Sequence, residues 1–375
     1  MNRILFYDLL NDGHHWNYNF NLVKGFSDYD CCYYTSLSGS ESGMAEQLDS
    51  ASVKIHTVKL LTSKNKFIRL VLNLLNTLRL IRFAEKNRYD RLHILYFDQV
   101  IVHLLLKIFF GRSIKVSATL HWLPKQRIKL YILSFLLKYS VVDIVIVHGE
   151  YLRNRLIESL GDRFAHKIFS VHYPIMSKNT INNKEIQLDL PELQYYHRPF
   201  VLCFGGTRYD KGLDLLLSAV NLIQEKQFSL LIVGEEQYFK RQYIEGMVSS
   251  IRNKVFLKLQ YIPENMMSMY FSAADIVVLP YRKFFSGQSG PLTEAANHRC
   301  IAIGPDVGQV GYTIQHYRLG EVFEAENVTN IAETLGKVID NAEVIKSRIL
   351  ENQKKYCEIC SLDGFVEAYR RILFS

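Results

Sequence analysis

A glycine-containing loop in the second half of the chain combines residue types suited to binding phosphate. The loop, FGGTRYDKG over 204–212, brings together Gly205, Gly206, Arg208 and Lys211. Glycines let the backbone approach a ligand closely, and the two cations add positive charge to the same turn. A helix predicted to begin at Leu213 aims its free N–H groups at the same place. The combination favours a diphosphate ligand; an ordinary strand-to-helix turn with solvated charges is the alternative.

A second loop, SGQSGPLTEA over 286–295, also precedes a predicted helix, which starts near Leu292. Ser286, Ser289 and Gly290 lie in the loop, where hydroxyl and backbone N–H groups can form another phosphate cradle. Glu294 lies one turn into the helix, and its carboxylate can accept hydrogen bonds from a vicinal diol such as ribose. A carboxylate that only complements the helix dipole is the alternative for Glu294.

A third turn and the cysteines are the remaining candidates for ligand-binding groups. Tyr261 and Ile262 precede Pro263 at the end of a predicted strand, where a turn can hold a nucleotide base by backbone contacts. Of the six cysteines, only Cys357 and Cys360 have CxxC spacing. No second pair completes a zinc site, and no Asp-x-Asp metal-binding loop stands in the relevant places. We therefore predict no metal.

The elements needed to position these loops alternate regularly. The first half has predicted strands at 3–10, 30–35, 53–59, 93–97, 114–119 and 142–148. The second half has them at 200–204, 230–233, 255–257, 275–279 and 300–303. Continuous apolar strands alternating with helices indicate a parallel sheet covered on both faces. Ligands bind beyond the carboxyl ends of such strands, where all three loops lie.

The length and the position of an irregular segment predict two domains. The chain has 375 residues, 48% hydrophobic and 22% charged, which is typical of globular proteins. The strand–helix alternation stops between about 173 and 198, where the sequence is polar and contains prolines. We predict an α/β chain with a first domain over 1–175, a linker over 176–198 and a second domain over 199–355, followed by a helix over 356–375.

Four blocks carry a family resemblance: FGGTRYDKGLDLLLSAV, LLIVG, YIPENMMSMYFSAADIVVLPY and SGQSGPLTEA, in this order within 200–310. They resemble the nucleotide-binding half of the GT-B glycosyltransferases, most closely the family-4 group of retaining enzymes. The resemblance implies a GT-B fold, two Rossmann-like domains with parallel sheets facing across a cleft. The last segment, SLDGFVEAYRRILFS, resembles the family's terminal helix that crosses back to the first domain.

The resemblance also implies roles for the matching residues of the second half. Arg208 and Lys211 match the basic pair on the donor diphosphate, and Glu294 matches the carboxylate that holds the ribose hydroxyls. The backbone of Ser289, Gly290 and Pro291 matches the loop that faces the phosphates.

The chain departs from the family at one motif position. The family often has a glutamate eight residues before the one matched by Glu294, and this chain has Ser286 there. That carboxylate is usually linked to the transferred sugar, so the departure leaves the donor sugar undetermined. Some relatives with a QSG-type loop also lack it.

The first half resembles the family more loosely. His121, which follows the strand-like SATL, matches a histidine that contacts the transferred sugar. Gly13, His14 and His15 lie where the family often has a glycine-containing loop near the acceptor. For His121 the alternative is a structural role at a strand end, and for His14 and His15 it is an ordinary surface loop.

These observations predict transfer of a sugar from a nucleotide diphosphate sugar, a UDP- or GDP-sugar, to a saccharide or lipid-linked saccharide acceptor. The resemblance implies retention of anomeric configuration, and bacterial surface polysaccharide biosynthesis is the expected setting. His121, Arg208 and Lys211 are the catalytic candidates. Because cations and two helix N-termini can stabilise the leaving diphosphate, the reaction needs no metal for that task. No cofactor is predicted, since the nucleotide sugar is a co-substrate.

The net charge of +8 is concentrated in the first half. Residues 1–190 hold 25 Lys and Arg against 16 Asp and Glu, a net of +9, so the remainder carries about −1. Nine basic residues within 59–91 are interleaved with apolar ones at helical spacing. Such a stretch can bind an anionic membrane surface, or can be a solvated helix face. With no secretory signal and no apolar run of ~18 residues, we expect a cytoplasmic protein, peripheral on the inner membrane face.

Other classes of protein fit less well. An epimerase on the same architecture would need no acceptor, and a phosphorylase would need a pyridoxal lysine and a longer chain. A non-catalytic subunit that binds a sugar nucleotide or a partner enzyme is the main alternative, because Ser286 replaces a carboxylate. The basic cluster has no nucleic-acid-binding motif, so no nucleic-acid partner is predicted.

Overall fold

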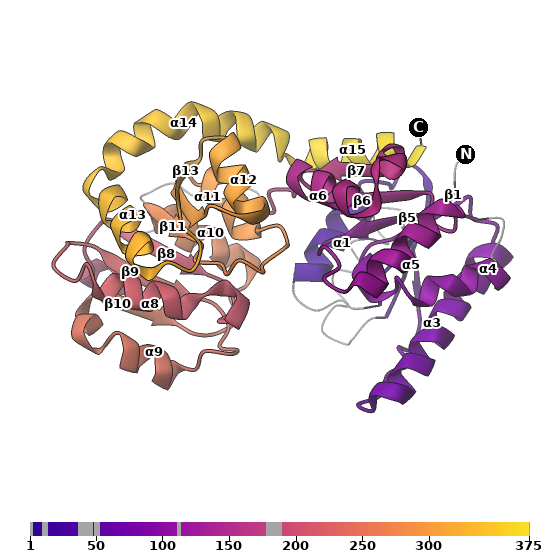
Figure 1. The fold of residues 1–375 in the computed structure, drawn as a ribbon, viewed down its shortest axis with the longest axis horizontal. Helices are drawn as coiled ribbons and strands as arrows, with labels where there is room; N and C mark the ends of the chain where they lie inside the picture. The colour runs from indigo at the N-terminus through magenta and orange to yellow at the C-terminus, as the bar shows by residue number, and fades with distance from the viewer. Residues whose placement is uncertain are drawn as a thin grey trace. The chain divides into compact units, whose positions relative to one another are not determined.

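The computed structural model describes residues 3–9, 14–36, 53–110, 114–177 and 190–374, together with Leu48. The chain divides into two compact units (Figure 1). Unit 1 consists of Met1–His172 and Leu362–Ser375, and unit 2 of Tyr173–Ser361. The last helix of the chain therefore belongs to unit 1.

Unit 1 is built on a parallel sheet with the strand order β3-β2-β1-β4-β5-β6-β7 in its described part. Its strands are β1 (Arg3–Tyr7), β2 (Asp30–Thr35), β3 (Lys54–Thr57), β4 (Arg91–Ile94), β5 (Lys115–Leu120), β6 (Ile144–His148) and β7 (Ile168–Val171). The chain order reverses between β1 and β4, which are direct neighbours in the sheet. Their pairing places Ile4 opposite Arg91.

Helices cover both faces of this sheet. They are α1 (His14–Lys24), α3 (Lys66–Lys86), α4 (Lys107–Phe110), α5 (Arg127–Lys138), α6 (Glu150–Leu160) and α15 (Leu362–Phe374), with 3-10 turns η1 (Phe97–Gln99), η2 (His103–Leu106) and η3 (Asp162–Lys167). Leu80 of α3, Leu133 of α5 and Leu152 of α6 share one apolar core with strand residues such as Leu92. Asn65 caps α3 by accepting hydrogen bonds from two backbone N–H groups of its first turn.

The other face of the unit 1 sheet is more polar and is covered by α1 and α15. His93 Nδ1 lies 2.9 Å from Ser117 Oγ, and His93 Nε2 lies 3.1 Å from Thr119 Oγ1. Thr119 Oγ1 lies 2.8 Å from the hydroxyl of Tyr369 in α15, which in turn lies 2.7 Å from the hydroxyl of Tyr18 in α1. A buried chain of hydrogen bonds thus ties both helices to the sheet.

Unit 2 is built on a second parallel sheet, with the order β10-β9-β8-β11-β12-β13 among the described residues. Its strands are β8 (Phe200–Phe204), β9 (Ser229–Val233), β10 (Val255–Lys258), β11 (Ile276–Val278), β12 (Ile301–Pro305) and β13 (Gly320–Phe323). Strands such as β9, whose sequence SLLIV is buried throughout, have the continuous apolar character of a doubly covered sheet.

Two apolar cores lie on the two faces of the unit 2 sheet. The helices are α8 (Leu213–Asn221), α9 (Arg241–Met247), α10 (Glu264–Ala273), α11 (Gly290–Asn297), α12 (Gly308–His316), α13 (Val328–Asp340) and α14 (Ala342–Ile359), with 3-10 turns η4 (Pro191–Tyr195), η5 (Tyr209–Lys211) and η6 (Ser249–Lys254). One core contains Leu216 of α8 and Leu335 of α13, and the other contains Tyr270 of α10 and Leu292 of α11. Each unit is therefore Rossmann-like, which confirms the predicted α/β class.

The described parts of the predicted linker belong to unit 2. Leu190 and Leu193 are buried in the core that also holds Leu292, and Ser177 is buried beside α11. Residues 178–189 of that linker lie outside the described part. The predicted boundary at 355 falls inside α14, and the chain passes to unit 1 only at Leu362.

Candidate functional site

The predicted phosphate-binding loop lies at the carboxyl end of β8, the central strand from which the order of unit 2 reverses. Gly205 has a φ of 121° and Gly212 a φ of 63°, both in the region that favours glycine. A Cβ atom at Gly212 would lie only 2.0 Å from the carbonyl oxygen of Pro280. Glycine at 212 therefore lets the loop pack against the segment after β11, which carries the second predicted loop.

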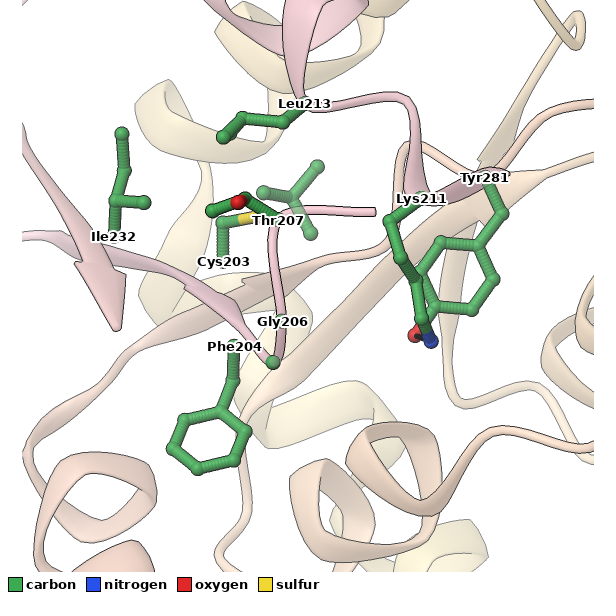
Figure 2. A pocket seen from close by; sticks show the side chains of 10 residues that line it. Cys203, Phe204, Gly206, Thr207, Lys211, Leu213, Ile232 and Tyr281 are labelled. Carbon is green, nitrogen blue, oxygen red and sulfur yellow. Dashed lines mark hydrogen bonds between the residues drawn. The ribbon is translucent and has the colours of Figure 1, made fainter. Parts of the chain in front are cut away.

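A small pocket opens between these segments (Figure 2). Its lining residues are Cys203, Phe204, Gly205, Gly206, Thr207, Lys211, Leu213, Ile232, Val278 and Tyr281. In Figure 2 the Lys211 side chain runs along the Tyr281 ring, with its nitrogen close to the phenol oxygen. The pocket thus joins the glycine loop to the residue that follows Pro280.

Lys211, Tyr281 and Ser289 form a connected polar cluster. Lys211 Nζ donates to the Tyr281 hydroxyl oxygen at 2.6 Å, and that hydroxyl lies 3.0 Å from Ser289 Oγ. The ammonium group also lies 3.8 Å from the centroid of the Tyr281 ring, within cation–π range. The two loops that the sequence predicted as phosphate cradles are therefore linked by a tyrosine that sequence reasoning missed.

The surroundings of Lys211 favour the neutral form of its amine. Burial between the rings of Tyr281 and Phe285, and then repulsion from Arg208, lowers the pKa of Lys211 to about 7. Burial also raises the pKa of Tyr281 well above its usual range, so its phenol stays neutral. An anionic ligand here would restore the charge of Lys211 and gain its full attraction.

Arg208, the other predicted diphosphate-binding cation, is paired with a carboxylate of the same loop. Its Nε donates to Asp210 Oδ1 at 2.9 Å and its Nη2 to Asp210 Oδ2 at 2.5 Å. Burial raises the pKa of Asp210, but the hydrogen bonds and charge of Arg208 outweigh it and hold that pKa below its usual range. Asp210 thus fixes the guanidinium and partly offsets its charge.

The second loop leads into α11 as predicted, with Ser289 at the N-cap position and Pro291 in the first turn. Ser289 does not cap the helix with its side chain, because its hydroxyl contacts Tyr281. The backbone N–H groups of the first turn of α11 thus receive no hydrogen bond from the Ser289 side chain. Ser286 Oγ and Gln288 Oε1 are buried atoms with no hydrogen-bond partner among the described residues.

Glu294 is 3% exposed, and its carboxylate already accepts hydrogen bonds from the chain itself. One carboxylate oxygen accepts hydrogen bonds from the backbone N–H groups of Met176 and Ser177, at 2.9 and 3.2 Å. The other accepts one from the Ser177 hydroxyl. Burial raises the pKa of Glu294, but hydrogen bonds from His298, Ser177 and Met176 outweigh it and lower that pKa below its usual range. The predicted ribose-binding group thus holds the chain segment that enters unit 2.

The predicted base-binding turn lies between β10 and α10. Tyr261 is 58% exposed, whereas Ile262 is buried in the core shared with α10. The turn stands at the same carboxyl edge of the sheet as the glycine loop, since β10, β9 and β8 are successive parallel neighbours. Ile262 is therefore a packing residue, whereas Tyr261 and Pro263 are exposed.

In unit 1, His121 follows β5 and is only 8% exposed. Its ring stacks on that of Tyr96 at 4.0 Å, and its Nε2 lies 3.0 Å from the carbonyl oxygen of Leu95. A carbonyl only accepts, so Nε2 carries the proton in this bond. Asp98 accepts hydrogen bonds from the backbone N–H groups of His121 and Trp122, and burial raises the pKa of Asp98 to about 6.

The acceptor candidates are less well defined. Gly13 lies outside the described residues, and His14 and His15 begin α1 with side chains that are likewise outside the description. Within the part of the chain that is described, no group of three or more His, Cys, Asp and Glu side chains could hold a metal ion.

Comparisons with known proteins show a family match in unit 2. Residues 198–341 match the family described as "Glycosyl transferases group 1". This segment lies within unit 2 and contains both predicted phosphate loops. A search of curated proteins gives no match.

Solved structures match the whole chain in fold. A glycosyltransferase from Rickettsia africae aligns with a TM-score of 0.77 and 16% identity, over 100% of this chain and 99% of its own. Anabaena HepE in complex with UDP aligns at 0.77 and 13%, over 99% of each chain. The lipopolysaccharide outer core galactosyltransferase WaaB aligns at 0.71 and 12%, over 100% and 99%. The resemblance to GT-B glycosyltransferases is confirmed.

Proposed function

We propose that this protein transfers a sugar from a nucleoside diphosphate sugar, a UDP- or GDP-sugar, to a hydroxyl of a saccharide or lipid-linked saccharide. The observation that carries the proposal is the cluster of Lys211, Tyr281 and Ser289, which joins two glycine-containing loops at the carboxyl edge of a parallel sheet. The group 1 family match covers the same segment. A complex of HepE, a structural neighbour, contains UDP.

The chemistry requires charge stabilisation on the leaving diphosphate. Lys211 and Arg208 supply cations, and the start of α11 supplies backbone N–H groups. These groups can do this work without a metal ion. We propose retention of anomeric configuration, with the donor phosphate accepting the acceptor's proton and His121 assisting.

We further propose that the enzyme works at the inner surface of a bacterial membrane, in surface polysaccharide synthesis. The N-terminal half of α3 exposes Phe67, at 75%, together with Ile68, Leu70 and Val71. Arg69 lies among them, and α5 likewise exposes Ile128 and Tyr131 between basic residues. Apolar side chains flanked by cations suit an anionic lipid surface. No described helix is both long and apolar enough to cross a membrane.

The first experiment is a donor panel. The protein is titrated calorimetrically with UDP-, GDP-, ADP- and dTDP-sugars, and nucleoside diphosphate release is followed. We expect one nucleotide class to bind, with Lys211→Ala weakening binding at least tenfold, about 1.4 kcal/mol. Lys355→Ala, at an exposed position on α14, is the matched control and should bind normally. Equal binding by Lys211→Ala would refute the donor site.

A non-catalytic subunit that binds a sugar nucleotide is the second candidate. Two observations favour it: Ser286 stands where the family often has a carboxylate, and Glu294 is held by Met176 and Ser177. Binding of a nucleotide sugar with no release of nucleoside diphosphate, with or without acceptors, would select this alternative.

A further inference from the structure

Arg282, in the segment that follows β11, bonds to the turn that carries Lys211. It is only 8% exposed. Its backbone N–H donates to the carbonyl oxygen of Asp210 at 3.1 Å, and its Nε donates to the carbonyl oxygen of Tyr209 at 3.0 Å. Both acceptors belong to η5, the 3-10 turn that ends at Lys211. One arginine thus bonds to the backbone of two successive residues of the turn that presents the candidate donor-binding lysine.

The guanidinium group of Arg282 is held from several directions. Its Nη2 donates to Oδ2 of Asp214, in the first turn of α8, at 2.6 Å. Its Nη1 donates to Oε1 of Glu326, which precedes α13, at 3.4 Å. Its Cζ lies 4.0 Å from the centroid of the Tyr209 ring, within cation–π range. The planar fork of an arginine can make these contacts at the same time, whereas the single ammonium group of a lysine cannot.

The pairing with Asp214 disfavours other positions of the guanidinium group. Asp214 Oδ1 is a buried atom with no hydrogen-bond partner among the described residues, and Oδ2 is bonded to Arg282. If Arg282 moved away, the carboxylate would lose the cation beside it, and a buried charge without a partner is strongly destabilising. Arg282 is therefore fixed, although its own segment forms neither helix nor strand at this position.

The influence of Arg282 on Lys211 runs through the turn and not through its charge. Burial is the largest cause that lowers the pKa of Lys211, and the charges that act on it include Arg208 and Asp210 but not Arg282. Figure 2 shows the Lys211 side chain along the ring of Tyr281, the residue that precedes Arg282. The same short segment therefore contacts the turn twice, at its backbone through Arg282 and at its lysine through Tyr281.

We propose that Arg282 is a positioning residue of the candidate donor site, which holds η5 in the conformation that places Lys211 against Tyr281. Asp214 and Glu326 hold Arg282 in turn. The inference rests on the proposed glycosyl transfer and adds the residue that fixes the geometry of its donor-binding cation. A cation that is fixed before the diphosphate arrives loses little freedom on binding, which favours affinity.

The test compares Arg282→Lys with the unaltered full chain. The variant keeps the positive charge and the backbone N–H but loses the forked side chain. A carbon-13 NMR titration of labelled lysine side chains, without nucleotide, follows the amine of Lys211, whose signal is the one missing from Lys211→Arg. The pKa of Lys211 is about 7 in the unaltered chain. We expect it to rise by roughly one pH unit or more in Arg282→Lys, because a loosened turn lets the amine reach water.

The second measurement is calorimetric titration with UDP and with GDP. We expect Arg282→Lys to bind the preferred nucleotide roughly five- to tenfold more weakly. The rise of the dissociation constant with pH should also begin at a higher pH than in the unaltered chain, because Lys211 keeps its proton longer. Arg252→Lys is the matched control and should behave like the unaltered chain. Arg252 also donates to a backbone carbonyl, that of Val255, and pairs with Glu245, but it lies in η6, before β10.

A general loss of stability would not change the pKa of Lys211 in the folded chain, so urea unfolding is measured separately. If Arg282→Lys does not fold, Asp214→Asn takes its place with the same expectations, because it removes the carboxylate that holds the guanidinium group and keeps the side-chain shape.

An unchanged pKa of Lys211 overturns the proposal, whether or not nucleotide binding weakens. A raised pKa of Lys211 in Arg282→Lys, in a chain that binds no nucleotide, supports the positioning role and refutes the proposed transfer alone. Nucleotide binding by the unaltered chain, with the same pKa of Lys211 and the same affinity in Arg282→Lys, refutes the positioning role alone.

Discussion

Lys211 is the residue whose chemistry depends most on its surroundings. With a pKa lowered to about 7, against an ordinary value near 10.4, its amine loses its proton in the empty site as the pH rises above neutrality. A diphosphate would bind the protonated form of Lys211. Above pH 7, binding would therefore require Lys211 to take up the proton that it has lost in the empty site. If the donor binds at Lys211 as proposed, its affinity depends on pH in a range where the diphosphate of a sugar nucleotide does not titrate.

We predict that the dissociation constant of the donor rises by up to about tenfold per pH unit above pH 7. Calorimetric titrations at pH 6, 7, 8 and 9 would measure this slope. Arginine stays protonated throughout, so Lys211→Arg should bind with little dependence on pH. The same slope in both proteins would show that another group is responsible.

Glu294 raises a different question, because the chain itself occupies it. Ser177 gives the carboxylate both a backbone N–H and a hydroxyl donor, and Asn297 Nδ2 holds that hydroxyl oxygen at 2.9 Å. A ribose diol would need the same acceptor oxygens. If Glu294 binds the donor ribose as proposed, donor binding must compete with the segment that enters unit 2.

We predict that Ser177→Ala tightens donor binding by roughly three- to tenfold, since one competing hydrogen bond of about 1 kcal/mol is removed. Glu294→Gln should weaken binding. Equilibrium titration with the donor found in the panel would measure both. Weaker binding by Ser177→Ala, together with a lower melting temperature, would make the contact purely structural.

The sequence predicted these residues unevenly, for physical reasons. Gly205, Lys211 and Ser289 stand out because loops that bind anions favour glycine, cations and hydroxyls. Tyr281 carries no such signal, since a tyrosine after a strand becomes informative only when its neighbours in space are known. Ser177 lies in a segment that reads as a linker, and its contact with Glu294 spans more than a hundred residues.

At the scale of elements, the strongly apolar strands were predictable. β2 and β8 have the bounds predicted from sequence, and α8 begins at the predicted Leu213. The edge strands β7 and β13 were missed, because their middle residues are only partly buried and the apolar run is short. The terminal helix predicted over 356–375 corresponds to the end of α14 followed by α15, which begins at Leu362.

The attachment of α15 can be tested at Tyr369. Its hydroxyl contacts Thr119 and Tyr18, and it is fully buried. We predict that Tyr369→Phe destabilises unit 1 by roughly 1–3 kcal/mol, because two buried hydroxyls lose a partner. Urea unfolding followed by circular dichroism would measure the loss. Tyr139→Phe, at an exposed tyrosine of the same unit, should unfold at the original midpoint; an unchanged midpoint for Tyr369→Phe would contradict the role of the hydrogen-bond chain.

Over the whole molecule, the net positive charge is concentrated in the first half of the chain, which also holds the run of exposed apolar side chains on α3. Residues 1–190 carry a net charge of +9, and the remainder about −1. The exposed apolar side chains of α3 lie in this basic half. An anionic surface would therefore attract unit 1 selectively.

We predict that the protein sediments with vesicles containing anionic lipid at low salt, and less at high salt because the attraction is screened. Phe67→Glu should reduce sedimentation several-fold by removing apolar contact and adding like charge to the lipid. Tyr195→Glu alters a side chain of similar exposure, 77% against 75%, in unit 2 and should have little effect. No sedimentation of the unaltered chain would remove the membrane from the proposal.

The placement of α15 has a consequence for how the chain is made. Unit 1 needs Tyr369 and Phe365 to cover the polar face of its sheet, yet these residues follow all of unit 2 in the sequence. When the ribosome has synthesised the first 172 residues, unit 1 is therefore still incomplete. Tyr18 and Thr119 still lack Tyr369, the tyrosine that joins them. Unit 2 is contiguous and can fold while it emerges, so the first domain to be translated is the last to be completed.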